Sequence, residues 1–141
     1  MSLPSAGYSG TPLWKKLGLK PGLRMFVLNP PADLDALLSG APPDLDRFER
    51  LAPFDAALAF VRSGRSLTAT LARLEPKLAA DGMIWIAWPK KSSGVTTDIT
   101  EDVVRAAALA LGLVDVKVCA IDATWSGLKL VRRLRDRRAL R

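Results

Sequence analysis

The sequence contains no histidine and only one cysteine, and both shortages narrow the chemistry open to the protein. Imidazole is the commonest general base and metal ligand, so histidine-dependent serine triads, two-histidine iron sites and histidine-bearing zinc sites are excluded. Cys119 alone can form neither an internal disulfide nor a four-cysteine zinc site. We therefore predict no metal site, and we expect Cys119 to be a small buried hydrophobe without a catalytic role.

Long apolar runs are also missing. The longest, residues 106–114, is well short of the roughly 18 residues that a membrane-spanning helix needs. The first ten residues have neither the basic start nor the apolar stretch that is typical of a secretory signal. Together with the single cysteine, these features predict a cytoplasmic protein with no membrane association.

The composition is that of a globular domain, with 49% hydrophobic and 25% charged residues in a chain of 141. A chain of this length forms one ordinary domain with a single core. We divide it into an N-terminal arm and short helix over residues 1–22, an α/β domain over residues 23–133, and an arginine-rich tail over residues 134–141.

The positive charge is concentrated near the C-terminus. Residues 132–141 carry six arginines against one aspartate, so they account for +5 of the formal net charge of +7. Such a run is usually a solvated extension, and no aromatic residues alternate with the arginines as they do in many single-strand binders. If the protein binds nucleic acid, we expect this run to provide the contacts, through Arg132, Arg133, Arg135, Arg137 and Arg138.

Hydrophobic periodicity and turn residues predict alternating strands and helices. The strands are expected at residues 24–28, 45–51 (an edge strand), 54–61, 83–88, 114–121 and 128–133. The helices are expected at residues 13–17, from Asp33 to Gly40, from a cap at Ser66 to Asp81-Gly82 with Pro76 kinking or shortening it, and from a cap pair of Asp98 and Glu101 to Gly112. The short connection between the last two strands favours a hairpin. We therefore predict a three-layer Rossmann-like α/β sandwich, with a mostly parallel sheet and a C-terminal antiparallel hairpin.

Several motifs resemble a bacterial family known as a domain of unknown function, DUF3052. They are Tyr8-Ser-Gly-Thr-Pro12, Ala87-Trp-Pro-Lys-Lys91 with Ser93-Gly94, Asp98-Ile-Thr-Glu-Asp-Val103, Leu111-Gly-Leu-Val-Asp-Val-Lys-Val118 and Thr124-Trp-Ser-Gly-Leu-Lys129. The resemblance extends over nearly the whole chain, and it implies no settled activity.

A looser resemblance is to class I methyltransferases that use S-adenosylmethionine. It is carried by Leu17-Gly-Leu-Lys-Pro-Gly22 before a strand, by Asp81-Gly82 before another, and by the closing hairpin. Those enzymes place a glycine-rich turn after the first strand, where this sequence has Asn29-Pro-Pro-Ala-Asp33. Two prolines remove two backbone donors, so the resemblance implies the fold while we expect no bound cofactor.

The loop of residues 88–97 is the strongest candidate for a binding site. It leaves the carboxyl end of a central strand and leads into a helix, which is where open α/β sheets bind their ligands. The residues expected to surround a phosphate or carboxylate are Lys90, Lys91, Ser92, Ser93, Gly94 and Thr97. The same sequence also fits a solvated loop beside a packed Trp88, or a protein-contact surface.

Trp125 and Ser126 lie between the last two predicted strands and complete the candidate site. Trp125 could stack on a planar ligand or pack in the core. Three functions follow from these features. The first is a non-catalytic binding module for a small anionic ligand or a protein partner. The alternatives are an S-adenosylmethionine-dependent methyltransferase-like enzyme and nucleic-acid association through the tail.

Overall fold

A computed structural model describes residues 10–140, so Tyr8 and the start of the predicted arm lie outside the described residues. Six strands form one sheet in the order β2-β1-β3-β4-β6-β5. Their bounds are β1 (Arg24–Leu28), β2 (Asp46–Phe48), β3 (Phe54–Phe60), β4 (Leu78–Pro89), β5 (Leu113–Ala120) and β6 (Trp125–Arg132). Strands β2, β1, β3 and β4 run parallel, while β6 runs antiparallel to both β4 and β5. The predicted mixed sheet with its closing hairpin is confirmed.

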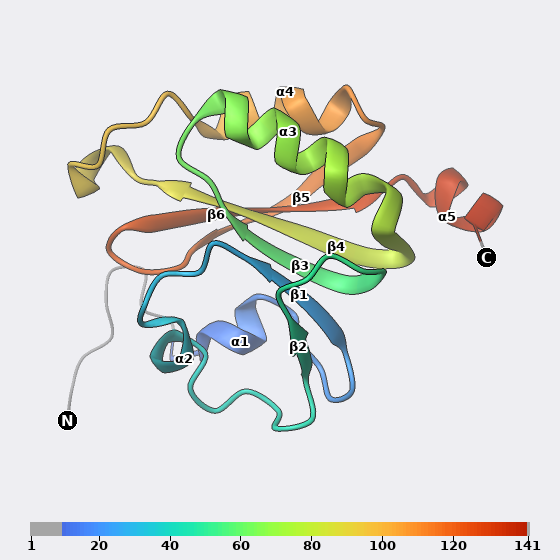
Figure 1. Cartoon of the computed structure of the whole chain (residues 1–141), viewed down its shortest axis with the longest axis horizontal. Helices are drawn as coiled ribbons and strands as arrows, with labels where there is room; N and C mark the ends of the chain where they lie inside the picture. The colour runs from blue at the N-terminus through green and yellow to red at the C-terminus, as the bar shows by residue number, and fades with distance from the viewer. Residues whose placement is uncertain (1–9, 141) are drawn as a thin grey trace.

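Helices lie on both faces of the sheet, which gives the predicted three layers (Figure 1). The short helices α1 (Leu13–Lys16) and α2 (Leu34–Leu37) cover one face, and α3 (Gly64–Leu74) and α4 (Glu101–Leu109) cover the other. The 3-10 turns η1 (Glu75–Lys77) and η2 (Lys91–Ser93) and the C-terminal helix α5 (Leu134–Leu140) complete the fold. Within the described part of the chain, no helix has the length and apolar character needed to cross a membrane.

The core consists of two apolar clusters, one on each face of the sheet. Because side chains alternate along a strand, neighbouring residues of β3 and β4 belong to different clusters. Ile84 and Ile86 pack under α3 and α4, whereas Trp85 packs under α1 and donates its indole N–H to the Leu17 carbonyl at 2.9 Å. Strands buried on both faces are nearly continuous apolar runs, which explains why the positions of these strands could be predicted from the sequence. Cys119 is buried, as expected.

The predicted start of α3 at Ser66 is wrong. The cap is Ser63, whose hydroxyl accepts a hydrogen bond from the Ser66 N–H at 3.1 Å. The predicted end at Asp81-Gly82 is also wrong, because Pro76 ends the α-helix at Leu74 and β4 begins as early as Leu78. Gly82 therefore lies inside β4. A glycine is needed there because a Cβ would come within 2.6 Å of the Asp55 carbonyl oxygen on β3.

The prediction that Asp98 and Glu101 cap α4 is also wrong. The helix begins at Glu101, and its cap is Thr100, whose hydroxyl accepts a hydrogen bond from Val103 N–H. Asp98 instead caps a different helix, since its carboxylate accepts a 2.7 Å hydrogen bond from the N–H of Gly64 at the start of α3. The stretch from Trp125 to Gly127, predicted to be a loop, is the first part of β6.

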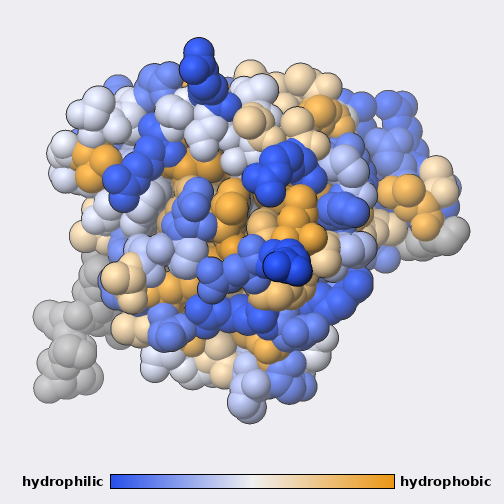
Figure 2. Space-filling view, in the orientation of Figure 1, coloured by the Kyte–Doolittle hydropathy of each residue, from blue (hydrophilic) through white to orange (hydrophobic). Residues whose placement is uncertain are grey.

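Figure 2 shows where hydrophilic and apolar side chains lie on one face of the molecule. Hydrophilic side chains cover most of the face seen there, and apolar ones surface mainly in the middle, below α3. Half-buried Leu28, Phe48 and Leu51 pack against the core cluster on the α3 and α4 side. The sheet edge at β2 is therefore less deeply covered than its centre.

Candidate functional site

The strand order creates a topological switch point between β1 and β3. After β1 the chain continues to β2 on one side, and it then returns to the other side to form β3. The crevice outside the carboxyl ends of two such strands is where open α/β sheets usually bind ligands. A cavity of about 330 Å³ lies at this place, lined by Asn29, Pro30, Pro31, Phe60, Val61, Arg62, Ser63, Ser66 and Trp125. Its volume is at the lower end of the range for small-molecule sites, roughly 300–1,000 Å³.

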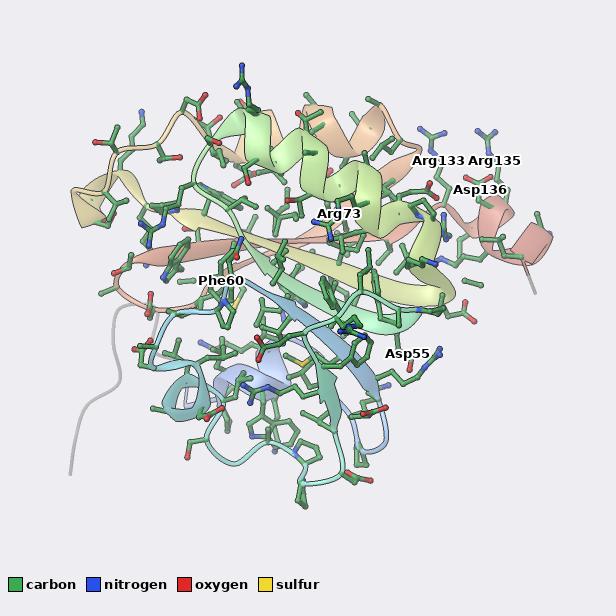
Figure 3. The ribbon with its side chains drawn as sticks, viewed as in Figure 1. Asp55, Phe60, Arg73, Arg133, Arg135 and Asp136 are labelled. Carbon is green, nitrogen blue, oxygen red and sulfur yellow. The ribbon has the colours of Figure 1, made fainter. Side chains whose placement is uncertain are left out.

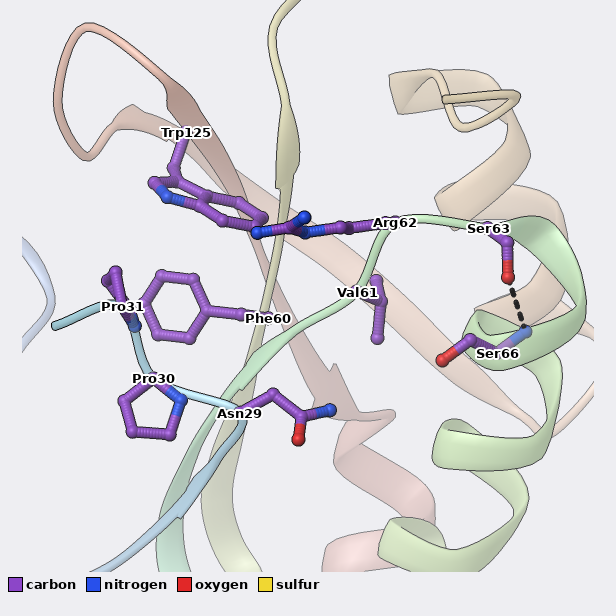
Figure 4. A pocket seen from close by; sticks show the side chains of 9 residues that line it. All are labelled: Asn29, Pro30, Pro31, Phe60, Val61, Arg62, Ser63, Ser66 and Trp125. Carbon is purple, nitrogen blue, oxygen red and sulfur yellow. Dashed lines mark hydrogen bonds between the residues drawn. The ribbon is translucent and has the colours of Figure 1, made fainter. Parts of the chain in front are cut away.

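One wall of the cavity is aromatic (Figure 4). The rings of Phe60 and Trp125 meet edge to face, with centroids 5.0 Å apart and an interplanar angle of 85°. The Arg62 guanidinium lies over the Trp125 ring, 5.7 Å from its centroid. Trp125 is only 6% exposed, so packing against Phe60 and Arg62 holds it in place.

The opposite wall is the turn that follows β1. Asn29 has a φ of 52°, a left-handed conformation that asparagine tolerates better than most residues. Pro30 and Pro31 follow, and their rings fix the backbone while supplying no N–H donors. The turn is therefore rigid and apolar, and its polar contribution to the cavity comes from the Asn29 amide.

The N-terminus of α3 forms the third side. Two N–H groups of its first turn are already satisfied, one by the Ser63 hydroxyl and one by Asp98. The backbone of Arg62 is also held, because its carbonyl accepts a 2.6 Å hydrogen bond from the Thr97 hydroxyl. The loop before α4 therefore fixes the strand-to-helix turn that presents Arg62 to the cavity.

The structure brings only part of the predicted site to this cavity. Trp125 lines it, and Thr97 contacts Arg62 from behind. The remaining predicted residues, Lys90, Lys91, Ser92, Ser93, Gly94 and Ser126, are not among its lining residues. Ser93 uses its hydroxyl locally, donating to the Lys90 carbonyl at 2.6 Å and accepting from the Val95 N–H.

Sequence reasoning missed the residues that line most of the cavity, chiefly Asn29, Phe60, Arg62 and Ser63. A signal was present, because the Arg62-Ser63-Gly64 segment follows a strand that was predicted to be central. The missing information was the strand order. Only the position of β3 beside β1, and not its apolar sequence, places Arg62 at the switch point.

The arginines near the C-terminus do not form one uniform tail. Arg132 belongs to β6, and its guanidinium pairs with Glu75 at 2.6 Å and donates to the carbonyls of Glu75 and Leu78. Arg133 directly precedes α5 and Arg135 lies in it, both at the C-terminal end of the molecule (Figure 3). Arg137 turns back, with its Nε–H donating to the Arg132 carbonyl at 2.8 Å. Arg132 is therefore already engaged inside the protein.

Solved structures of methyltransferases share the fold. A precorrin-6y C5,15-methyltransferase from Geobacter metallireducens GS-15 is 12% identical over 86% of this chain and 86% of its own, with a TM-score of 0.59. A magnesium protoporphyrin IX methyltransferase from Synechocystis PCC 6803 with bound SAH is 11% identical over 85% of this chain and 78% of its own, with a TM-score of 0.58. A ribosomal protein L11 methylase from Lactobacillus delbrueckii subsp. bulgaricus is 13% identical over 86% and 75%, with a TM-score of 0.55. These likenesses show that this chain shares the Rossmann-like fold of these structures.

The turn after β1 does not fit S-adenosylmethionine as Rossmann folds hold such cofactors. A glycine-rich turn normally lets the backbone approach the cofactor before a helix begins. Here Pro30 and Pro31 occupy the turn, and the helix that follows, α2, has only four residues. The chain has the fold of these enzymes without their usual cofactor cradle.

The sequence itself identifies a family. None of the curated protein sequences matches this chain. A family model described as "Protein of unknown function (DUF3052)" matches residues 43–134. The match covers all of the sheet except β1, and it includes four of the five motifs noted above while leaving Tyr8 to Pro12 outside. The chain therefore belongs to the DUF3052 family.

Proposed function

We propose that the protein is a binding module that holds a small anionic ligand in the switch-point cavity, without catalysing a reaction. The observation that carries this proposal is the position of Arg62. Its guanidinium lies over Trp125 at a cavity that has the location expected for a ligand in this fold, and its backbone carbonyl is held by the Thr97 hydroxyl.

Each wall of the cavity suits such a ligand. A guanidinium binds a phosphate or carboxylate through two parallel hydrogen bonds, so Arg62 would hold the anionic group. The hydroxyls of Ser63 and Ser66 and the Asn29 amide can hydrogen-bond to polar substituents. Phe60 and the prolines provide an apolar surface for the body of the ligand.

The absence of catalysis is proposed from the groups present in the wall. Among the described residues that line the cavity, Arg62 is the only one with an ionisable side chain. General acid–base catalysis requires a group whose pKa can be brought near neutral pH, and a guanidinium does not meet that requirement. Binding is what these residues can do together.

A thermal-shift screen tests the proposal. Adenine nucleotides, sugar phosphates and small carboxylates would be tested against the unmodified protein, Arg62→Gln and the control Arg73→Gln, which removes an exposed guanidinium from the C-terminal end of α3, away from the cavity. We expect at least one compound to raise the melting temperature of the unmodified protein and of Arg73→Gln but not of Arg62→Gln. A shift that survives in Arg62→Gln and disappears in a Lys90→Ala, Lys91→Ala variant would move the site to the loop before α4.

S-adenosylmethionine binding is the second candidate, and one feature favours it. Glu49 directly follows β2, the strand beside β1, and lies 20 positions after Asn29. An acidic residue at about this separation binds the ribose hydroxyls in many Rossmann folds. Calorimetry decides the question: saturable heat that is lost in Glu49→Gln supports a methyltransferase-like protein, whereas no heat from the unmodified protein rejects it.

A further inference from the structure

A second hollow lies at the opposite end of the sheet from the switch-point cavity. It has a volume of about 440 Å³, and its charged lining residues are Lys20, Asp55, Asp81, Lys129 and Arg137. Asp55 and Phe60 mark the two ends of β3 in Figure 3, so the two sites are separated by the length of this strand. We call it the basic hollow.

The basic hollow is built around Lys129. This residue lies in β6 and points toward α1, with its Nζ 4.0 Å from the position that a Cβ on Gly18 would occupy. Its direct partner on β5 is Lys117, whose ammonium also points toward α1 and donates to the Lys16 carbonyl at 3.1 Å. Like charges placed directly opposite each other in an antiparallel pair destabilise a sheet.

A bulge brings the two lysines together. The register between β5 and β6 shifts between Asp115 and Lys117, so Val116 is the extra residue. Bulges commonly redirect a side chain next to a functional site. Asp115, on the other side of the shift, pairs with Arg105 of α4 on the opposite face of the sheet. The bulge therefore places Lys117 on the α1 face of the sheet, the face toward which Lys129 points.

Among the described residues, two carboxylates line the hollow, Asp55 and Asp81. Lys20 and Arg137 line the hollow together with Lys129, and Asp55 is committed to Arg24 through contacts of 2.9–3.2 Å. Burial, followed by the charges of Lys117, Lys20 and Arg137, lowers the pKa of Lys129. Three cations thus line the hollow, and among the residues that the structure describes the one lining carboxylate besides Asp55 is Asp81.

We propose that the basic hollow is a second binding site, which takes a compact phosphate-bearing ligand such as a phosphomonoester or diphosphate. The ammonium groups of Lys20 and Lys129 would neutralise the phosphate as point charges, and Arg137 would bind it through its fork of N–H donors. The volume suits a small ligand, and walls from the segment after α1, from β4 and β6 and from α5 favour a compact anion over an extended chain. Such a ligand offsets the repulsion between Lys117 and Lys129.

Calorimetry of the full-length protein with inorganic pyrophosphate tests the proposal. We expect one site per chain to remain when the Arg62 cavity is removed by Arg62→Gln. In that background Lys129→Met should raise the dissociation constant about tenfold or more, since hydrogen bonds to charged groups are the strong ones. The matched control Lys77→Met removes an exposed lysine that does not line the hollow and should leave the affinity unchanged. Arg137→Gln provides a second variant, expected to weaken binding in the same direction.

Two results would overturn the proposal: no saturable heat with pyrophosphate, or equal affinities in Lys129→Met and Lys77→Met. If pyrophosphate does not bind but RNA oligonucleotides bind more strongly as their length increases, the surface is a nucleic-acid site instead. Arg62→Gln separates this site from the proposed ligand cavity, because it should leave pyrophosphate binding to the basic hollow intact. In the absence of ligand, Lys129→Met should unfold at a temperature equal to or above that of the unmodified protein, which shows that any loss of binding is not a loss of folding.

Discussion

Removing the guanidinium of Arg132 should destabilise the fold far more than removing any other arginine near the C-terminus. Its side chain is 11% exposed and makes three hydrogen bonds, one to the Glu75 carboxylate and two to backbone carbonyls at the junction of η1 and β4. Arg132→Met leaves those carbonyls without a donor, at about 1–3 kcal/mol for each buried group, and regains part of this by burying the methionine. We expect a net loss of about 3 kcal/mol in the free energy of unfolding.

Glu75→Gln is the partner variant, and it should cost about 2 kcal/mol because it removes the charge that faces Arg132 while keeping the shape of the side chain. The double variant should cost less than the sum of the single ones, because the two groups interact directly. Urea unfolding followed by tryptophan fluorescence measures all three. Arg135→Met is the control, since Arg135 is 76% exposed and its ion pair with Asp136 spans 3.9 Å.

The control should change the free energy of unfolding by less than about 0.5 kcal/mol. If Arg132→Met changes it as little as Arg135→Met does, Arg132 is an ordinary surface arginine. The interpretation of Arg132 as a clamp between β6 and the start of β4 would then be refuted.

Three further predictions concern Gly82, Asp55 and Cys119. Gly82→Ala should lower the free energy of unfolding by about 1–3 kcal/mol, because the new Cβ would clash with the Asp55 carbonyl at 2.6 Å, and urea unfolding no different from that of the unmodified protein would contradict this. The hydrogen bond from Arg24 lowers the pKa of Asp55 below its ordinary value of 3.8, so the carboxylate stabilises the fold above that pH and this stabilisation is lost as the pH falls through the lowered pKa. In Asp55→Asn the free energy of unfolding should therefore start lower and decrease less steeply with falling pH. Parallel curves for the two proteins would argue against the Arg24–Asp55 pair. Burial raises the pKa of the Cys119 thiol, so the native protein should react with a disulfide reagent much more slowly than the urea-unfolded protein, and equal rates would show that the thiol is exposed.

The sheet was largely predictable because its strands are buried on both faces. Residues 24–28, 54–61 and 83–88 are apolar runs bounded by turn residues, and each corresponds to the main part of a strand. The helix caps were less predictable, because capping depends on partners that are distant in sequence. Asp98 seemed to begin its own helix, yet it caps α3, 34 positions earlier in the chain.

The candidate site was less accessible from sequence than the fold. Nothing in the sequence distinguishes Arg62 from the other exposed arginines. It lines the cavity because β3 pairs with β1. The basic hollow depends on a bulge and on the cross-strand pairing of Lys117 with Lys129, and sequence spacing shows neither. Trp125 was predicted from sequence to belong to the site, but its contacts with Phe60 and Arg62 could not be predicted without the three-dimensional structure.

The central claim is that the switch-point cavity binds an anion through Arg62. The most direct test is a proton–nitrogen correlation spectrum recorded during a titration with inorganic phosphate, following the Arg62 Nε–H, the Trp125 indole N–H and the backbone of Ser63 and Ser66. We predict saturable shifts at these groups that disappear in Arg62→Gln. Shifts confined to Lys90 and its neighbours, with Arg62 and Trp125 unmoved, would contradict the claim.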